Sequence, residues 1–404
     1  LDYRRGGEDC CGLLKKSRNG TRDAAQNWGD ELGATLQDMG LRKGKASPCF
    51  FYSARRRLKA AVHGDDITLK GPRSEVEKFI RDISLRYEVK TQIMGAAADL
   101  PKSVKILNRV LTWSNQGIWM EADPRHVQEV ITALGLERAN VVATPFAEVR
   151  GAEVTSAAQA PEATSAAQNP WRTSAAQALE ANDPLQAPRE IAGADATAYR
   201  AVAARLNYLA LDRPDIRFAV TKACAAMRKP TSEDWTVLKR IGRYLKGRPR
   251  AAGLYAWQRQ PEAITVYSDS DWAGDKRTRK STSGGCILHG SHLIKGWSKG
   301  QQVVALSSAE AELYAATKAA AEGIGVQSLA TDVGETRRVR LGMDSSAALA
   351  LNQREGLGKA KHICIQELWL QDAKRKGEII LFKVPGEHNP TDLYTKGLSA
   401  DRIR

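Results

Sequence analysis

The chain lacks a long apolar run. No stretch approaches the roughly 18 consecutive apolar residues that a membrane-spanning helix needs, so we predict no membrane partner. The first residues, LDYRRGGEDCC, contain neither an initiator Met nor the apolar core of a signal peptide, and we expect a fragment of a longer protein. Six cysteines occur without CxxC spacing, which argues against a zinc site or a disulfide framework and fits a reducing compartment.

Positive charge is what the chain has in excess. Lys and Arg total 61 against 46 Asp and Glu, which gives a formal net charge of +15. An excess of this size favours a polyanionic partner, most often nucleic acid, over the alternative of a merely soluble basic protein. The 404 residues are enough for about two or three domains.

A segment of unusual composition divides the chain. The sequence TSAAQ starts at Thr155, Thr164 and Thr173, within a stretch rich in Ala, Gln, Thr and Pro. Such a stretch has too few large apolar residues to offset the entropy lost on ordering, and we interpret it as a low-complexity linker or a weakly helical spacer. A mixed α/β domain, this linker, a helical connection and a second α/β domain are expected over residues 1–146, 147–192, 193–258 and 259–404.

The helical connection contains one clearly amphipathic helix, TSEDWTVLKRIGRYLKGRP. Ser232 suits its N-cap, Gly247 suits its end, and apolar residues from Trp235 to Leu245 form a stripe. The cations that fall largely off this stripe either contact nucleic-acid phosphates or form a solvated surface. Candidate nucleic-acid-binding residues are Lys239, Arg240, Arg243, Lys246 and, further along the chain, Lys299.

From Ile264 onward, the pattern predicts a mixed sheet covered by helices. ITVYSD is typical of a strand, GGCILHGSHLIKGW of a hairpin and QQVVAL of another strand. A long helix follows from about Ala309, and the strands VRLGMD and EIILFKVP then alternate with helices. Three strands in a meander followed by this alternation indicate an α/β architecture.

Carboxylates recur at the ends of these elements. Asp269 and Asp344 each end a predicted strand, the position where sites gather in open α/β sheets. Two more acids lie at the start of the long helix, where Ser307 and Glu310 fit a capping box. Glu312 is about 200° further around the helix and has no such local role, so we assign it a functional one.

A divalent metal would explain these acids together with Asp392, in the last segment. Four converging carboxylates repel one another without a cation, and oxygen ligands suit Mg²⁺ or Mn²⁺. Two such ions about 4 Å apart can activate a water and stabilise the leaving oxygen of a phosphodiester. The alternative is four unrelated surface acids.

Six segments follow one another in a fixed order over roughly residues 262–400: VYSDSDWAGD, STSGG, WSKGQQVVALSSAEAELYAA, DSSAALAL, KHICI and VPGEHNPTDLYTKGL. This series resembles the ribonuclease H domain in the Pol polyproteins of copia-type LTR retrotransposons. Upstream, LNYLALDRPDIRFAV and DWTVLKRIGRYLKG resemble the connection to reverse transcriptase, and VHGDDITL resembles the later part of the reverse transcriptase itself.

The resemblance implies a ribonuclease H-like mixed sheet flanked by helices, preceded by a partial α+β reverse transcriptase palm and thumb. It implies an endonuclease that uses two Mg²⁺ or Mn²⁺ ions to cut the RNA strand of an RNA–DNA hybrid, which leaves a 3′-hydroxyl and a 5′-phosphate. The hybrid would be selected by its 2′-hydroxyls and its shape. The catalytic and metal-binding residues carried over are Asp269, Glu312, Asp344 and Asp392.

The resemblance also bears on neighbouring residues. His388 is either a residue that moves protons or product, or a plain loop histidine. In the opening motif, we expect Asp271 to shape the turn and Asp275 to pair with the basic run KRTRK that follows it. Expected partners are the hybrid and other Pol or Gag products of the element. The expected location is intracellular, in cytoplasmic virus-like particles, the nucleus or both.

Asp65 and Asp66 resemble the second and third metal carboxylates of reverse transcriptase, and their alternative is an ordinary hairpin turn. The first metal acid of the family would precede Leu1, so we expect no polymerase activity from this chain alone. The family usually has Asp where Cys364 stands, and the linker is longer and more repetitive than in the family.

Two competing functions remain when these departures are weighed against the four acids. A decayed relic that binds nucleic acid without cutting is favoured by Cys364 and the incomplete polymerase. An active ribonuclease H is favoured by the presence of all four acids. A transposase or integrase would share the fold, but the order Asp, Glu, Asp, Asp, with Glu on the first long helix, argues against one.

Overall fold

The computed structural model describes residues 17, 20–21, 23–147, 189–354, 356 and 369–403. Cys364 and the predicted linker lie outside the described residues, except for the linker's first residue and its last four. Two compact units are present, Leu1–Gln92 with Gly325–Arg337 and Ile93–Ile324 with Arg338–Arg404. The finer segment boundaries given above stay a prediction.

The first unit contains an antiparallel sheet with the strand order β1-β2-β3-β4. Its elements are α1 (Ala24–Asp38), β1 (Arg42–Lys43), β2 (Phe50–Ser53), β3 (Leu58–His63), β4 (Asp66–Lys70) and α2 (Arg73–Ser84). Leu36 of α1, Leu58 of β3 and Phe79 of α2 are buried together in one apolar core. The sequence predicts such a mixture of helix and strand for residues 1–146, of which this unit holds the first 92.

A second antiparallel sheet, with the order β5-β6-β7-β8, belongs to the larger unit. Its strands are β5 (Ser103–Ile106), β6 (Arg109–Trp113), β7 (Gly117–Ala122) and β8 (Ala252–Ala256). β7 precedes the linker in the chain and β8 follows it, yet the two strands pair, with Gly117 opposite Ala256. Only glycine fits at Gly117, because a Cβ there would lie 2.2 Å from the carbonyl oxygen of Tyr255.

Four helices of the same unit share one core: α3 (Arg125–Ala133), α5 (Gly193–Leu209), α6 (Pro214–Ala225) and α7 (Ser232–Gly247). The predicted apolar stripe of α7 is confirmed, since Trp235, Leu238, Ile241 and Leu245 are all buried. The predicted cap is wrong by one residue. Thr231 is the N-cap, because its hydroxyl and the carboxylate of Asp234 accept each other's backbone N–H in a capping box.

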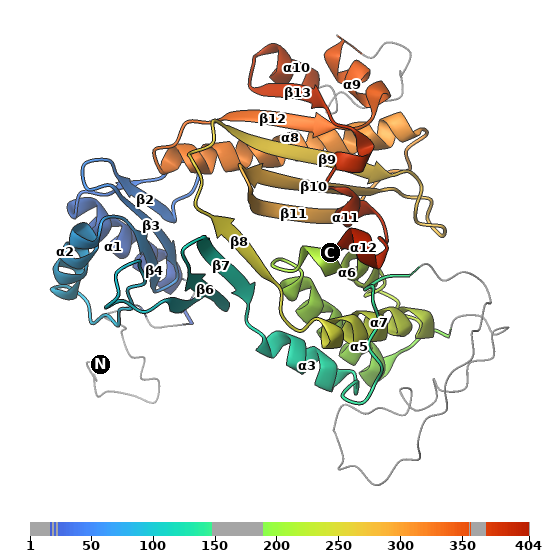
Figure 1. The fold of residues 1–404 in the computed structure, drawn as a ribbon, viewed down its shortest axis with the longest axis horizontal. Helices are drawn as coiled ribbons and strands as arrows, with labels where there is room; N and C mark the ends of the chain where they lie inside the picture. Colours follow the sequence, from blue (N-terminus) through green and yellow to red (C-terminus); the bar gives the residue numbers. More distant parts are fainter. Residues whose placement is uncertain are drawn as a thin grey trace, which may run out of the picture. The chain divides into compact units, whose positions relative to one another are not determined.

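The last sheet has five strands in the order β11-β10-β9-β12-β13 (Figure 1). These are β9 (Ala263–Asp271), β10 (Thr282–His289), β11 (His292–Gly300), β12 (Arg338–Met343) and β13 (Ile379–Lys383). β9, β10 and β11 form an antiparallel meander, whereas β12 runs parallel to both β9 and β13. This topology confirms the predicted ribonuclease H-like mixed sheet.

One predicted strand is wrong. The QQVVAL segment follows the end of β11 at Gly300 and forms no strand. Val303 and Val304 are 48% and 47% exposed, so this β-branched run neither pairs in the sheet nor enters the core.

The remaining elements are α8 (Ser308–Asp332), α9 (Ser346–Gln353), α10 (Trp369–Arg375), the 3₁₀ helix η2 (Gly386–His388), α11 (Asp392–Thr395) and α12 (Ala400–Ile403). α8 packs closely on one face of the five-stranded sheet, where a Cβ on Gly323 would lie 2.7 Å from Val266. α11 packs on the opposite face, where a Cβ on Gly284 would lie 2.5 Å from Thr395. The end of β9 is thus enclosed by α8 and α11. Among the helices described, none has the length and apolarity needed to cross a membrane.

Candidate metal centre

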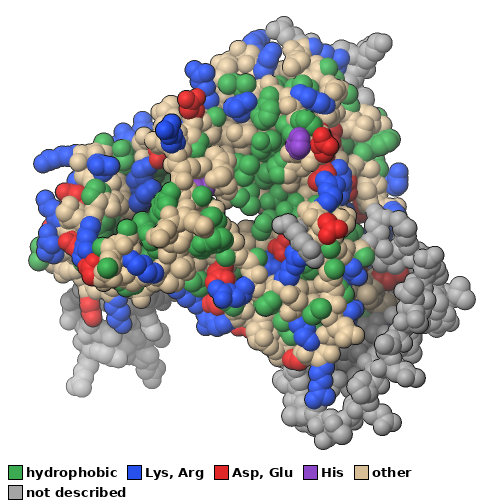
Figure 2. Space-filling view, viewed as in Figure 1, with side chains coloured by type: hydrophobic (Ala, Val, Ile, Leu, Met, Phe, Trp, Pro, Cys, Tyr) green, Lys and Arg blue, Asp and Glu red, His purple; other side chains and the backbone are tan. Residues whose placement is uncertain are grey.

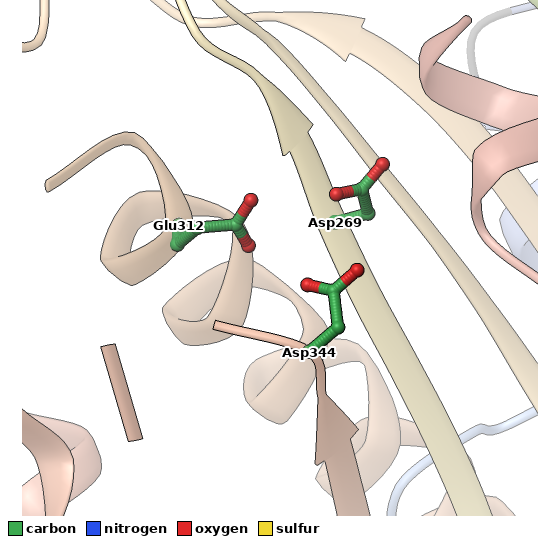
Figure 3. A group of neighbouring side chains, drawn as sticks. All are labelled: Asp269, Glu312 and Asp344. Carbon is green, nitrogen blue, oxygen red and sulfur yellow. The ribbon is translucent and has the colours of Figure 1, made fainter. Parts of the chain in front are cut away.

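Three of the four predicted carboxylates converge at one edge of the five-stranded sheet. Asp269 lies near the end of β9, Asp344 directly follows β12 and Glu312 lies near the start of α8 (Figure 3). Each offers an oxygen within 4.8 Å of the others. The parallel register explains the approach of the two aspartates, because Ser268 pairs with Met343 and each acid is the next residue along its strand.

The two glutamates of α8 have different surroundings, as the sequence predicts for the helix start. The backbone N–H of Glu310 donates to the Ser307 hydroxyl at 3.2 Å, and the Glu310 carboxylate accepts the N–H of Leu306 at 2.8 Å. Glu312 instead faces β9, where its Oε1 accepts both the backbone N–H and the hydroxyl of Ser270 at 3.0 Å. Glu310 therefore stabilises the start of α8. Glu312 instead belongs with Asp269 and Asp344 to a cluster of three carboxylates, which we call the acidic group.

Burial and mutual repulsion make it unfavourable for the carboxylates of the acidic group to be charged, and a bound cation would offset both effects. Burial, together with the charges of Asp269 and Asp344, raises the pKa of Glu312 to about 8. Burial also raises the pKa of Asp269, against the opposing hydrogen bond from Thr395. The second oxygen of Glu312, Oε2, is buried without a hydrogen-bond partner. An orphaned carboxylate oxygen beside two further carboxylates fits a hard divalent cation such as Mg²⁺.

The fourth predicted acid, Asp392, does not join this group. Its carboxylate is held by two cations, with Lys396 Nζ at 2.5 Å from Oδ1 and Arg402 Nη2 at 2.7 Å from Oδ2. Burial opposes them, but the hydrogen bonds from Lys396 and Arg402 hold the pKa of Asp392 below its ordinary value. Lys396 Nζ also lies 3.5 Å from Asp269 Oδ2, so its ammonium group stands between the two acids.

We expect Lys396→Met to bind Mg²⁺ or Mn²⁺ at least about tenfold more tightly, because a unit charge near the site repels an incoming cation by a few kcal/mol at an effective dielectric constant of about 20. Isothermal titration calorimetry measures the change directly. Lys318→Met is the matched control, since Lys318 pairs with Glu322 on the surface of α8. Unchanged affinity in the Lys396 variant, or an equal gain in the control, would contradict the expectation.

Sequence reasoning missed two side chains that hold this edge together. Asn389 is buried and donates to the carbonyl of Ser268 at 3.1 Å, while its own Oδ1 accepts from Thr391. The hydroxyl of Thr395 donates to Asp269 Oδ2. The only available signal was their position in the same closing segment as Asp392. His388, by contrast, is 73% exposed on η2, with Nε2 at 3.8 Å from Glu387.

The predicted nucleic-acid-binding cations of α7 are largely engaged within the protein. Three of them donate hydrogen bonds of 2.6–2.8 Å to the segment that follows α3. The bonds join Arg240 to the Thr144 hydroxyl, Arg243 to the Asn140 carbonyl, and Lys246 to the carbonyls of Glu137 and Ala139. These bonds fasten α7 to the segment after α3 and occupy one guanidinium nitrogen of each arginine and the ammonium group of Lys246. Lys239 is half-buried, and Lys299 is exposed on β11.

In the smaller unit, the predicted residual polymerase acids lie on a hairpin. Asp65 is in the turn between β3 and β4, Asp66 begins β4, and both are exposed. Within the described ranges, no third acid joins them to form a group able to hold a metal.

Comparison with known proteins shows which proteins the chain is similar to. No family model matches it. It is 26% identical over 398 residues to the retrovirus-related Pol polyprotein from transposon RE2 of Arabidopsis thaliana, with 96% of this chain and 24% of that protein covered. It is 35% identical over 208 residues to the Pol polyprotein from transposon RE1 of the same plant, covering 51% of this chain and 14% of that protein.

Among solved structures, the foamy viral protease-reverse transcriptase in complex with an RNA/DNA hybrid is similar over 95% of this chain and 40% of that one, at 11% identity and a TM-score of 0.49. The chain spans about a quarter or less of the length of the two curated relatives. Both of these relatives are retrovirus-related Pol polyproteins. Over nearly its whole length, the chain is similar in sequence to the Pol polyproteins of copia-type retrotransposons.

Proposed function

We propose that residues 259–404 form a ribonuclease H that cuts the RNA strand of RNA–DNA hybrids with two Mg²⁺ or Mn²⁺ ions. The observation that carries this proposal is the convergence of Asp269, Glu312 and Asp344, in which the buried Oε2 of Glu312 has no hydrogen-bond partner. Relatives named as Pol polyproteins over 95–96% of the chain support it.

Each residue has a distinct task in the proposed reaction. Asp269, Glu312 and Asp344 hold the metal, while Ser270 orients Glu312 and Thr395 orients Asp269 through their hydrogen bonds. When bound, divalent ions activate a water and stabilise the leaving oxygen of the phosphodiester.

Asp392 completes the ligand set when Lys396 withdraws from it, and so makes room for a second ion. His388, exposed beside this segment, is the proposed proton-transfer group through Nε2.

The proposed substrate is recognised by its 2′-hydroxyls and its helical shape rather than by base sequence. Proposed partners besides the hybrid are other Pol and Gag products of the same element, in an intracellular location. We propose no polymerase chemistry for residues 1–146 of this chain alone, because Asp65 and Asp66 are exposed on a hairpin without a third acid among the described residues.

One observation favours a second function, a relic that binds nucleic acid without cutting it. The carboxylate of Asp392 is paired with Lys396 and Arg402 instead of facing the other three acids. If this pairing is permanent, the ligand set stays at three carboxylates and hydrolysis fails while binding persists.

Incubation of the whole chain with a labelled RNA–DNA hybrid separates the two functions. With Mg²⁺, we expect the RNA strand to be cut into products with 5′-phosphate and 3′-hydroxyl ends, and EDTA to stop the reaction. Duplex DNA and duplex RNA of the same sequence serve as controls and should stay intact. Binding of the hybrid without cleavage in either Mg²⁺ or Mn²⁺ would refute the ribonuclease and support the relic.

A further inference from the structure

Net charge alone does not locate the nucleic-acid surface. Lys and Arg side chains are spread over the face shown in Figure 2, among many uncharged groups. A cation can bind a phosphate only if its donors are free, so hydrogen bonding discriminates better than charge. By this measure, three of the four cations of α7 are poorer candidates, because each already donates to an acceptor within the protein.

The connection between β9 and β10, residues 272–281, has the opposite character, and we call it the basic loop. Lys276, Arg277 and Arg279 are exposed and Lys280 is half-buried. Within the part of the chain that the structure describes, no carboxylate forms an ion pair with any of these four side chains. Their charges are therefore available to a ligand.

The basic loop is held in shape without using its cations. Asp275, which the sequence suggested as their ion-pair partner, instead accepts the backbone N–H groups of Arg277 at 2.9 Å and Thr278 at 3.1 Å. Backbone hydrogen bonds also join Asp275 to Lys280 and Arg279. A loop fixed in this way loses little conformational entropy when it binds.

The basic loop begins next to the acidic group. Trp272 is three residues beyond Asp269, and at about 3.3 Å per residue the start of the loop is about 10 Å along the backbone from Asp269. Ten ångströms corresponds to about three steps of a nucleic-acid strand at about 3.4 Å per step. The two ends of the basic loop are held together by Asp271, which accepts the N–H of Thr282 and lies 3.7 Å from Lys222 Nζ.

An exposed aromatic side chain accompanies these cations. Trp272 is 53% exposed, and its Nε1 donates to the carbonyl of Ala305 at 3.1 Å. That bond fixes the edge of the indole and leaves half of its surface open. Free cations beside an ordered aromatic ring are a combination that binds sugar–phosphate backbones and bases.

We propose that the basic loop, which starts about three steps of a nucleic-acid strand from the acidic group, binds the sugar–phosphate backbone of the RNA–DNA hybrid. Lys276, Arg277 and Arg279 contact phosphates, and Trp272 packs on an adjacent sugar or base. That the ligand is an RNA–DNA hybrid rests on the proposed function. That the cations of the loop can bind a ligand rests on their lack of ion pairs among the described residues. The loop, rather than α7, is then the main nucleic-acid interface of this unit.

The test measures binding without cleavage. In the Asp269→Asn background with EDTA, fluorescence anisotropy gives the Kd of a labelled hybrid over a range of salt concentrations. The triple variant Lys276→Gln, Arg277→Gln and Arg279→Gln should raise the Kd at least about tenfold. It should also lower the slope of log K against log salt by about 2–3, since each lost phosphate contact contributes about 0.9.

The matched control removes the same charge elsewhere on the five-stranded domain. Lys374→Gln, Arg375→Gln and Lys376→Gln change the last two residues of α10 and the residue after it, and should leave the salt slope unchanged. An unchanged slope in the loop variant, or an equal decrease in the control, would overturn the proposal. So would equally tight, loop-dependent binding of labelled polyglutamate, which would show a site for acidic protein.

A separate variant tests the aromatic contact. Trp272→Ala should raise the Kd by about 5- to 150-fold, because stacking contributes about 1–3 kcal/mol per base, and should leave the salt slope unchanged. An unaltered Kd would remove Trp272 from the interface. Because cleavage is absent throughout, failure of the ribonuclease assay and failure of this proposal are distinguishable.

Discussion

Asp269→Asn is expected to reduce cleavage of the RNA–DNA hybrid by at least about a thousandfold, with the chain still folded. Asparagine has the same shape and keeps an oxygen that can accept the hydrogen bond from Thr395. It lacks the negative charge that a hard divalent cation requires of its ligand. Loss of metal-assisted stabilisation worth about 4 kcal/mol corresponds to this factor. Initial rates at saturating Mg²⁺ give the measurement.

The same motif provides a control, Asp271→Asn. Asp271 accepts a hydrogen bond from Thr282 and lies near Lys222, so it belongs to the base of the basic loop rather than to the acidic group. We expect it to retain cleavage within about tenfold of the unmutated chain. Equal rates for all three proteins would exclude Asp269 from the reaction, and equal losses in both variants would indicate a structural cause instead.

Arg213→Ala is expected to lower the free energy of unfolding by about 3–5 kcal/mol, because it leaves a partly buried carboxylate without its cation. Arg213 is 1% exposed and forms a bidentate pair with Asp215, at 2.9 and 2.7 Å. Its third nitrogen donates to the carbonyl of Arg248 at 3.1 Å, so one side chain joins the start of α6 to the end of α7. Urea unfolding followed by tryptophan fluorescence measures the change.

A double variant distinguishes the stability lost with the contacts of Arg213 from the stability lost because the Asp215 carboxylate is left unpaired. Asp215 also accepts the Tyr244 hydroxyl at 2.9 Å, so its carboxylate keeps one neutral donor after Arg213 is removed. Arg213→Ala with Asp215→Ala should recover part of the stability, since no unpaired charge then remains. A loss below about 1 kcal/mol in the single variant would show that Arg213 has no structural role of this kind.

The acidic group was predictable because its determinants are local. A strand followed by Asp269, a strand followed by Asp344, and a capping pair that accounts for Glu310 are each visible within a few residues. The parallel pairing of β9 with β12 then brings two of these acids together, as expected for strand ends that meet at one edge of a sheet.

Long-range pairing was the part that sequence reasoning could not supply. The acceptors of Arg243 and Lys246 precede them by 103 to 109 residues, and nothing in the amphipathic pattern of α7 distinguishes a paired cation from a free one. The neighbouring position of Lys396, one helical turn after Asp392, was visible, but its approach to Asp269 depends on how α11 packs against β10. The prediction of a strand at QQVVAL was wrong for a related reason, because a high strand propensity does not by itself provide a neighbouring strand to pair with.

The pairing of β7 with β8 affects how the polypeptide can be divided. Hydrogen bonds between Gly117–Ala122 and Ala252–Ala256 join chain segments on either side of residues 148–188, and Val130 of α3 shares a core with Leu206 of α5 and Leu238 of α7. A proteolytic nick within 148–188 would break the covalent backbone and leave all of these contacts in place. The two products would remain a noncovalent complex, so a cut at this site releases no separate domain.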